Sequence, residues 1–208
     1  MQHLRWYGVV ALIVLLGGWY VYATRERPVA NYPSAGTDII AFGDSLVAGS
    51  GASPGNDFIS LLSRKIGRPI INLGVSGDTT ADGLARVNEL DQYQPKIVLL
   101  LLGGNDHLRR VPAETTFTNL ATLIEAIQAR GAIVLLLGVK GNLIGDSFAS
   151  AFEELRDTYH TAYVSNVLGG LFGNSQYMAD AIHPNDAGYA VIADRIYPVL
   201  LPLLSGRI

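Results

Sequence analysis

The sequence predicts an α/β protein in which helices cover both faces of a mostly parallel, five-stranded sheet, with one membrane-spanning helix at the N-terminus. Three observations support this fold class. Short apolar runs alternate with helical patterns along most of the chain, as they do in βαβ units. One of these runs, residues 96–102 (KIVLLLL), is continuously apolar, as a strand covered on both faces must be. At the N-terminus, residues 6–23 contain no charged side chain.

Composition limits the chain to one domain of ordinary size and excludes several function classes. Apolar residues make up 49% of the 208 residues and charged residues 16%, which is typical of a folded domain with a buried sheet. The formal net charge is -3 and no run of Lys or Arg is present, so we expect no nucleic-acid partner. The chain has no cysteine, which excludes disulfides, thiolate metal sites and a cysteine nucleophile.

The N-terminal stretch is interpreted as a membrane anchor at residues 1–24. At ~1.5 Å per residue, residues 6–23 cover roughly the ~30 Å hydrocarbon core of a bilayer. Trp and Tyr side chains at both ends favour a retained helix, with the following domain on the periplasmic or extracytoplasmic side. A signal peptide cleaved after Ala23 is the alternative, and it would leave an exported, soluble protein. Residues 25–37, rich in Pro and small polar residues, are expected to link the anchor to a domain at residues 38–208.

The first half of this domain is expected to contain three strands and two helices. Residues 38–42 (DIIAF) and 69–73 (PIINL) are short apolar runs that predict the first two strands. Residues 57–66 between them have a helical pattern and are followed by glycine, a common helix end. Residues 80–90 carry their apolar side chains on one helical stripe. The run 96–102 then forms the third strand, at the centre of the sheet.

The second half is expected to add two strands and three helices. Residues 112–130 form a long amphipathic helix, with proline at its start and glycine just past its end. Residues 132–137 (AIVLLL) are the fourth strand, and residues 161–164 a short fifth one. The helix at residues 147–160 lies between these two strands, and the helix at residues 184–204 closes the domain.

Four polar blocks stand where an open parallel sheet binds its ligands or close to the C-terminus. Such ligands bind beyond the carboxyl ends of the strands, so the turns after the first three strands are the places to search. The blocks are residues 42–46 (FGDSL), 72–77 (NLGVSG), 103–106 (GGND) and 180–184 (DAIHP). Taken in order, they resemble the motif set of the GDSL/SGNH hydrolase family, and they are most similar to its exported acyl-thioesterases, lysophospholipases and arylesterases.

This resemblance implies a serine hydrolase with the SGNH hydrolase fold, whose sheet is flavodoxin-like. It implies Ser45, Asp180 and His183 as catalytic residues. It also implies an oxyanion hole made by the backbone N–H groups of Ser45 and Gly74 and the side-chain amide of Asn105. The implied reaction cleaves carboxylic esters or thioesters of small acyl, aryl or lysophospholipid substrates through an acyl-enzyme intermediate, without metal or cofactor. For a lipid substrate, we expect the anchored site to face the lipid surface.

The residues support the same chemistry by themselves. Acyl transfer needs a nucleophile, a base within hydrogen-bond reach and a group that orients the base. Ser45 offers a hydroxyl at a strand-to-helix turn, although a helix-capping serine is the alternative interpretation. Asp180 lies one turn before His183, close enough to orient its ring, and Pro184 restrains the backbone at the histidine. The alternative for this pair is a loop aspartate and a helix-capping histidine.

Three other functions stand as alternatives. A carbohydrate O-acetyl esterase or acetyltransferase would use the same fold, and so would a non-catalytic acyl- or glycan-binding module. A metal-dependent phosphoesterase needs several His and carboxylate ligands, but the chain has 4 His and no His-x-His pair. Among the neighbouring residues, we expect Asp44 to fix the turn and Ser76 to lack a base. His107 is expected to be an exposed loop residue, and the alternative is that it lines the acyl or leaving-group side of the site.

Overall fold

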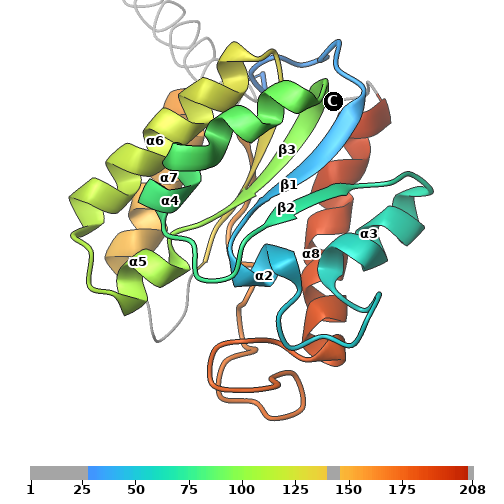
Figure 1. Cartoon of the computed structure of the whole chain (residues 1–208), viewed down its shortest axis with the longest axis vertical. Coiled ribbons are helices and arrows are strands. Elements are labelled where there is room, and N and C mark those ends of the chain that lie inside the picture. Colours follow the sequence, from blue (N-terminus) through green and yellow to red (C-terminus); the bar gives the residue numbers. More distant parts are fainter. Residues whose placement is uncertain (1–27, 140–145, 206–208) are drawn as a thin grey trace, which may run out of the picture.

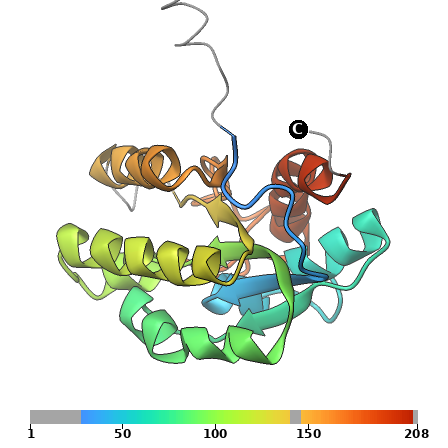
Figure 2. The same cartoon turned by 90° about the horizontal axis from the view of Figure 1, so that it is seen from above.

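The computed structural model describes residues 28–139 and 146–205. In this part of the chain, five strands form one parallel sheet in the order β2-β1-β3-β4-β5, with helices on both faces (Figure 1, Figure 2). This is the flavodoxin-like strand order. The predicted α/β sheet with its two helical layers is therefore confirmed, whereas the predicted N-terminal membrane helix lies outside the described residues.

The central strands are buried because helices cover both faces of the sheet. The strands are β1 (Asp38–Gly43), β2 (Ile71–Gly74), β3 (Pro95–Leu101), β4 (Ile133–Leu137) and β5 (Ala162–Val164). All of β4, and all of β3 except Lys96, is buried, which explains why both runs are so apolar. The second strand begins two residues later than predicted, because the N–H of Ile70 donates to Ser63 Oγ and not to β1.

Two layers of helices cover this sheet. The longer helices are α3 (Phe58–Ile66), α4 (Thr80–Arg86), α6 (Ala113–Ala129), α7 (Asp146–Tyr159) and α8 (Asp186–Ser205). Helices α3 and α8 pack together on one face, and α4, α6 and α7 cover the other (Figure 2). They agree with the predicted helices, except that α4 ends at Arg86 and the chain continues as a 3-10 helix, η1 (Val87–Gln92).

Two short helices that were given no residue ranges in the sequence analysis follow β1 and β3. Helix α2 (Ser45–Ala48) follows β1 directly, and α5 (Gly104–Leu108) follows β3 after a short turn. A helix of four or five residues is too short to produce a periodic apolar pattern, so apolar periodicity predicts the bounds of neither helix. Both begin at the carboxyl ends of neighbouring strands, and their first turns therefore face the same edge of the sheet (Figure 1).

The described part of the predicted linker, residues 28–37, is bound to the domain. Asn31 Nδ2 donates to the carbonyl oxygens of Gln128 at 2.8 Å and of Ala132 at 2.9 Å, and Tyr32 packs against the core. These contacts lie at the edge of the sheet where the strands begin, away from α2 and α5 (Figure 1). Residues 28–37 are therefore part of the folded domain and do not form a free coil.

Helix α8 is, within the described part of the chain, the one helix that is long and apolar enough to cross a membrane. One stripe of its apolar side chains, however, faces the interior of the domain, while Leu201 is exposed. Ile192, Ile196 and Leu200 are each buried to within 1% of complete coverage, and the helix packs against α3. The hydropathy of α8 is thus explained by its place in the core.

Candidate active site

The turn after β1 presents Ser45 at the start of α2. Gly43 ends the strand, and a β-carbon there would lie 2.2 Å from the carbonyl oxygen of Leu101 on β3, so only glycine fits. Asp44 is the N-cap of α2, since its Oδ1 accepts a hydrogen bond of 3.0 Å from the N–H of Leu46. The prediction that Asp44 fixes this turn is confirmed. Because Asp44 caps the helix, the hydroxyl of Ser45 is left for other contacts.

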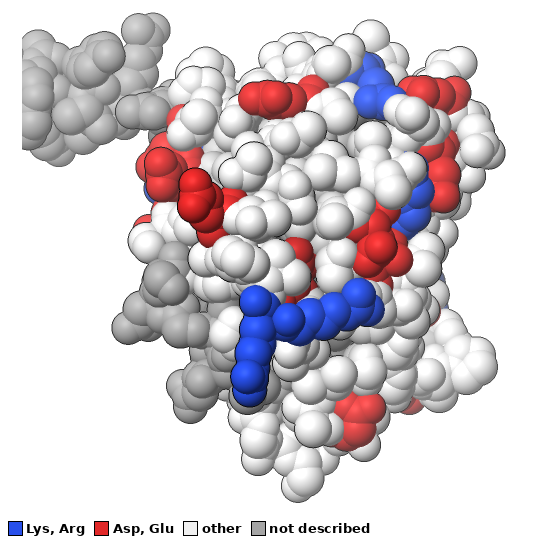
Figure 3. Space-filling model, turned by 60° about the vertical axis from the view of Figure 1, so that its left-hand side comes forward, with Lys and Arg blue, Asp and Glu red and all other residues white. Residues whose placement is uncertain are grey.

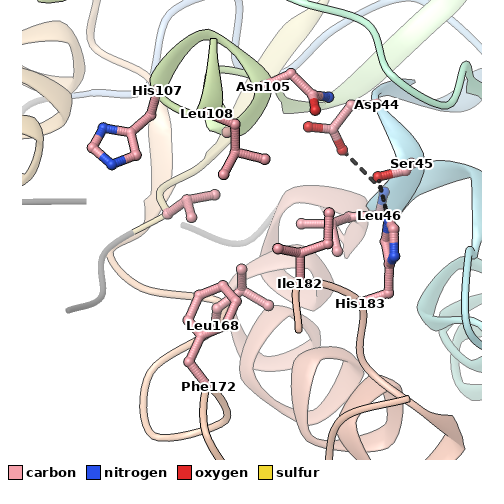
Figure 4. A pocket seen from close by; sticks show the side chains of 12 residues that line it. Asp44, Ser45, Leu46, Asn105, His107, Leu108, Leu168, Phe172, Ile182 and His183 are labelled. Atoms are coloured by element: carbon pink, nitrogen blue, oxygen red, sulfur yellow. Dashed lines mark hydrogen bonds between the residues drawn. The ribbon is translucent and has the colours of Figure 1, made fainter. Parts of the chain in front are cut away.

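Ser45, His183 and Asp180 form one hydrogen-bonded chain. The Nε2 atom of His183 lies 3.0 Å from Ser45 Oγ (Figure 4). The Nδ1 atom of the same ring lies 2.8 Å from Asp180 Oδ2. Residues that are 138 positions apart in the sequence are thus brought into contact. The structure therefore places a hydroxyl, an imidazole and a carboxylate in the arrangement that activates a serine nucleophile.

The carboxylate of Asp180 is fixed by its own loop. Its Oδ1 accepts hydrogen bonds from the backbone N–H groups of Ile182 at 2.8 Å and His183 at 2.7 Å. The bond from the His183 ring, followed by these two backbone donors, lowers the pKa of Asp180 to about 2. Asp180 is therefore ionised at neutral pH, as a group that orients an imidazole must be.

Asp44 is a second carboxyl group beside the nucleophile, and its surroundings have the opposite effect. The side chain is 4% exposed, and this burial raises the pKa of Asp44 to about 7, with the nearby carboxylates of Asp78 and Asp106 adding to the rise. The bond from Leu46 and the charge of His183 act against it. A group that titrates near neutrality therefore lies next to Ser45.

Two of the three predicted oxyanion donors are available at this site. The backbone N–H of Ser45 lies in the first turn of α2 and has no acceptor within the described residues. Asn105, near the start of α5, lines the same cavity as Ser45. Its Nδ2 donates one hydrogen bond of 2.9 Å to the carbonyl of Asp78, which leaves the second N–H of the amide for a ligand.

The third predicted donor, Gly74, is differently placed. Its N–H donates to Asn72 Oδ1 at 2.9 Å, so it already has an acceptor. Glycine is required there for another reason, because a β-carbon would lie 2.2 Å from the backbone nitrogen of Ala48 in α2. The structure therefore does not bring the Gly74 N–H to Ser45 and Asn105.

Gly77, in the same loop, is a donor that the sequence analysis missed. Its N–H has no acceptor in the described part of the chain. It directly precedes Asp78, whose carbonyl oxygen binds the Asn105 amide, so Gly77 lies close to the Asn105 side chain. The available signal was the second glycine of the block 72–77, but the choice between the two depends on the Asn72 side chain.

An apolar cavity with an empty volume of about 470 Å³ opens beside these groups. Its apolar lining comes from Leu46, Leu108, Val139, Leu168, Phe172 and Ile182. Figure 4 shows Ser45 and His183 at one end of the cavity and His107 at the other. The expectation of an exposed loop histidine is wrong for His107, because this residue is half-buried in α5 and packs edge-on against Phe148, with ring centroids 5.5 Å apart.

Charged groups near the cavity do not form a metal centre. Across residues 28–139 and 146–205, no three His, Asp or Glu side chains gather closely enough to hold a metal ion. Arg109 and Arg110 follow α5 and are exposed, and Figure 3 shows a strip of basic side chains on the face that carries α4, α5 and α6.

The hydroxyl of Ser76 is paired with the hydroxyl of Ser50 at 3.1 Å.

Comparison with known proteins identifies the family of this chain. The sequence profile of the GDSL-like Lipase/Acylhydrolase family matches residues 41–191, which include all four polar blocks. Esterase TesA of Pseudomonas aeruginosa is 32% identical over 183 residues, covering 82% of this chain and 91% of that protein. Thioesterase 1/protease 1/lysophospholipase L1 of Escherichia coli strain K12 is 30% identical over 181 residues, covering 83% of this chain and 87% of the relative.

The fold is similar to that of solved structures as well. The crystal structure of TesA superimposes with a TM-score of 0.76 at 32% identity, covering 80% of this chain and 99% of the other. The family predicted from the four blocks is thereby confirmed. Since the family profile spans most of the described domain, this chain belongs to the GDSL-like lipase/acylhydrolase family of hydrolases.

Proposed function

We propose that this hydrolase cleaves carboxylic esters and thioesters of small acyl, aryl or lysophospholipid substrates through an acyl-enzyme intermediate on Ser45. The observation that carries the proposal is the pair of hydrogen bonds from His183, at 3.0 Å to Ser45 Oγ and at 2.8 Å to Asp180 Oδ2. Relatives that are named esterase and thioesterase/lysophospholipase support both classes of bond.

In the acylation step, Ser45 Oγ attacks the acyl carbon while His183 Nε2 takes the hydroxyl proton. Asp180 accepts from Nδ1–H, which keeps the ring in the tautomer that can receive this proton and stabilises the resulting imidazolium. When the tetrahedral intermediate collapses, the carbon–oxygen or carbon–sulfur bond breaks and His183 gives the proton to the leaving group. Water then attacks the acyl-enzyme by the same route and releases the acid.

The negative charge that develops on the acyl oxygen needs donors aimed at it. We assign this role to the backbone N–H of Ser45 and the free N–H of the Asn105 amide, and to the Gly77 N–H in place of Gly74. The assignment rests on which donors lack an acceptor in the described part of the chain. Each such donor typically lowers the barrier by about 2.7–4 kcal/mol.

The apolar cavity suits the acyl part of the substrate. Its apolar side chains can cover a hydrocarbon chain, and burying each CH₂ against them contributes about 0.8 kcal/mol. The exposed Arg109 follows Leu108, which lines the cavity, and it donates to the Gly77 carbonyl at 2.7 Å and lies 3.9 Å from Asp82. An anionic leaving group, such as the phosphate of a lysophospholipid, would be attracted to the positive charge of Arg109.

The test is hydrolysis of aryl esters of increasing acyl length, acyl thioesters and lysophospholipids by purified variants. Ser45→Ala and His183→Ala are expected to abolish activity on every substrate while circular dichroism stays unchanged. Ser34→Ala is the matched control, because Ser34 lies at the opposite end of the sheet, where its hydroxyl donates to the Gly131 carbonyl at 2.7 Å, so it should keep wild-type turnover. Turnover by Ser45→Ala close to the wild-type value would contradict the proposal.

For localisation, we propose that residues 6–23 hold the domain at a membrane on its extracytoplasmic side. The uncharged stretch with aromatic residues at both ends supports this proposal, although the stretch lies outside the described residues. Residues 28–37 are attached where the strands begin, whereas Ser45 lies where β1 ends. This arrangement supports an orientation with the site directed away from the membrane, in contrast to the lipid-facing site expected from the sequence.

A further inference from the structure

Arg86, the last residue of α4, makes several contacts beneath the active site. Its Nε lies 2.6 Å from Asp78 Oδ2, and its Nη2 donates to the carbonyl of Gly43 at 2.9 Å. Its Nη1 binds Glu89 at 3.2 Å, and the guanidinium lies 4.1 Å from the ring centroid of Phe42. The side chain is 14% exposed. Arg86 is therefore a largely buried cation with a partner for each nitrogen and for its flat face.

These partners belong to the segments that carry the oxyanion donors. Gly43 stands two residues before Ser45, at the end of β1. Asp78 follows Gly77, and its carbonyl oxygen accepts from the Asn105 amide. One guanidinium thus connects the turn after β1 with the loop after β2 and, through Asp78, with the start of α5.

We propose that Arg86 is a positioning residue that holds the backbone N–H groups of Ser45 and Gly77 and the amide of Asn105 in the arrangement that binds the oxyanion. The inference rests on the proposed acyl-transfer function. Arg86 does not line the cavity, so it acts through Gly43 and Asp78 and not on the substrate.

The shape of the guanidinium is essential to this role. Its planar fork presents donors in several fixed directions and stacks on an aromatic ring at the same time, which the single ammonium of lysine cannot do. Its charge matters as well, because Asp78 is buried close to Asp44 and Asp106. Without Arg86, an unpaired carboxylate would lie next to Asn105 and oppose negative charge on the acyl oxygen.

If Arg86 only stabilised the fold, its substitution would lower stability without a specific loss of kcat. Arg130 provides a matched control for this comparison. Arg130, just after α6, has a similar set of bonds, at 2.7 Å to Asp91, 3.1 Å to Asn88 and 2.7 Å to the Ala126 carbonyl. Its side chain is 20% exposed. None of these partners lines the cavity, so Arg130 measures the cost of losing such an arginine away from the site.

The test compares Arg86→Lys with Arg130→Lys by kinetics on an aryl acetate, thermal unfolding and inhibition by an alkylboronic acid, which forms a tetrahedral adduct with an active serine. For Arg86→Lys we expect kcat to fall about 10–100-fold with little change in KM. The inhibition constant of the boronic acid should rise in proportion, because this adduct imitates the transition state. Arg130→Lys should lower the unfolding temperature similarly and leave kcat and the inhibition constant unchanged.

A double-mutant cycle with Asn105→Ala adds a readout that a structural role would not move. If Arg86 acts through Asn105, the two substitutions together should cost less in kcat than the product of their separate effects. Should Arg86→Lys fail to fold, Asp78→Asn replaces it in the same cycle, because it removes the partner of the guanidinium and keeps the side-chain size.

Two results would overturn the inference. One is an Arg86→Lys enzyme whose loss of kcat is no larger than that of Arg130→Lys, and the other is a loss found entirely in KM. These outcomes differ from a failure of the proposed function, which would appear as retained hydrolysis by Ser45→Ala.

Discussion

At the residue scale, the site depends on Asp44 capping α2, which leaves the Ser45 hydroxyl free to contact His183. A serine at the start of a helix usually satisfies a free backbone N–H, which would hold its hydroxyl away from any substrate. Here Asp44 accepts from Leu46, and Ser45 Oγ instead lies 3.0 Å from His183. The capping alternative for Ser45 thus fails because the preceding residue already caps α2.

Asn105 allows the oxyanion assignment to be tested by one substitution. Asn105→Ala is expected to lower kcat by about 10²–10³-fold with little change in KM, because its amide would bind the oxyanion more strongly than the ground-state carbonyl. The control is Asn119→Ala, which removes an amide that donates to Thr80 in α4 at 3.1 Å, away from the cavity. A change confined to KM would make Asn105 a substrate-binding residue only.

The raised pKa of Asp44 leads us to predict that the stability of the fold decreases as pH rises toward neutrality. Burial raises its pKa from 3.8 to about 7, so between these values the folded chain keeps a proton that the unfolded chain has lost. The free energy of unfolding should therefore fall as pH rises through this window, and its contribution should be constant above it. Asp44→Asn removes this contribution while its amide oxygen can still accept from Leu46.

Urea unfolding of both proteins at intervals between pH 4 and pH 8 measures the effect. Relative to the wild type, Asp44→Asn should become progressively more stable as pH rises, and folding should take up one proton fewer within the window. Parallel stability profiles of the two proteins would show that Asp44 is already ionised throughout this pH range. Activity is not needed for this measurement, so it is independent of the catalytic assignment.

At the element scale, the sequence predicts the strands that are buried on both faces. It does not predict features that depend on length alone or on a single hydrogen bond, such as the short helices and the contact of the Gly74 N–H. Strands β3 and β4 were predictable because covering both faces demands continuous apolar runs. Helices α2 and α5 were not, because four or five residues make no complete apolar stripe. The resemblance implied Gly74 as a donor, but both Gly74 and Gly77 suit a turn, and the hydrogen bond from the Gly74 N–H to Asn72, which no sequence pattern shows, distinguishes them.

The residues of the site also differ in how far the sequence predicts them. The sequence indicates Ser45, Asp180 and His183 because acyl transfer requires a hydroxyl, a base and an orienting group, and because the blocks that contain them resemble the family's motif set in its order. The half-buried position of His107 was not, because it depends on Phe148 of α7, a residue 41 positions away whose ring meets the imidazole edge-on. Packing between distant elements leaves no local pattern in the sequence.

The loop between β5 and α8 offers a prediction about acyl-chain length. Phe172 lines the catalytic cavity and also an adjacent open groove that includes Met178 and Ala179. Phe172→Ala should join the two spaces and move the preferred acyl chain of aryl esters to greater length. Because Phe172 is only partly buried, the loss of stability should be smaller than the about 3–5 kcal/mol typical of a fully buried Phe→Ala change.

The matched control for this loop is Met178→Ala, which trims the groove without touching the catalytic cavity. It should leave the chain-length profile of kcat/KM unchanged. If Phe172→Ala and Met178→Ala both keep the wild-type profile, the acyl chain does not run toward this loop.

At the scale of the whole molecule, the parallel sheet places residues 28–37 and the active site at opposite ends. All strands point the same way, so Ser45 and Asn105 gather at one end and residues 28–37 at the other. Strand β1 alone has six residues, which span about 20 Å at ~3.3 Å per residue. Between Ala23 and Pro28 only four residues remain, with a reach of about 14 Å when fully extended. A tether this short would keep the attached end near the membrane and the site away from it.

This geometry leads to the last prediction, which compares the full-length protein with a form beginning at Pro28. The full-length protein should sediment with membranes, and the shortened form should stay in solution with the same kcat on aryl esters. Placed in vesicles that contain a lysophospholipid, the full-length protein should hydrolyse this lipid no faster than the shortened form added from outside, because its site is directed away from its own bilayer. A strong advantage of the full-length protein would show instead that the site reaches the lipid surface. Native protein recovered in solution with Thr24 as its first residue would identify residues 1–23 as a cleaved signal, and the tether would then be absent while the hydrolase chemistry of Ser45 remained.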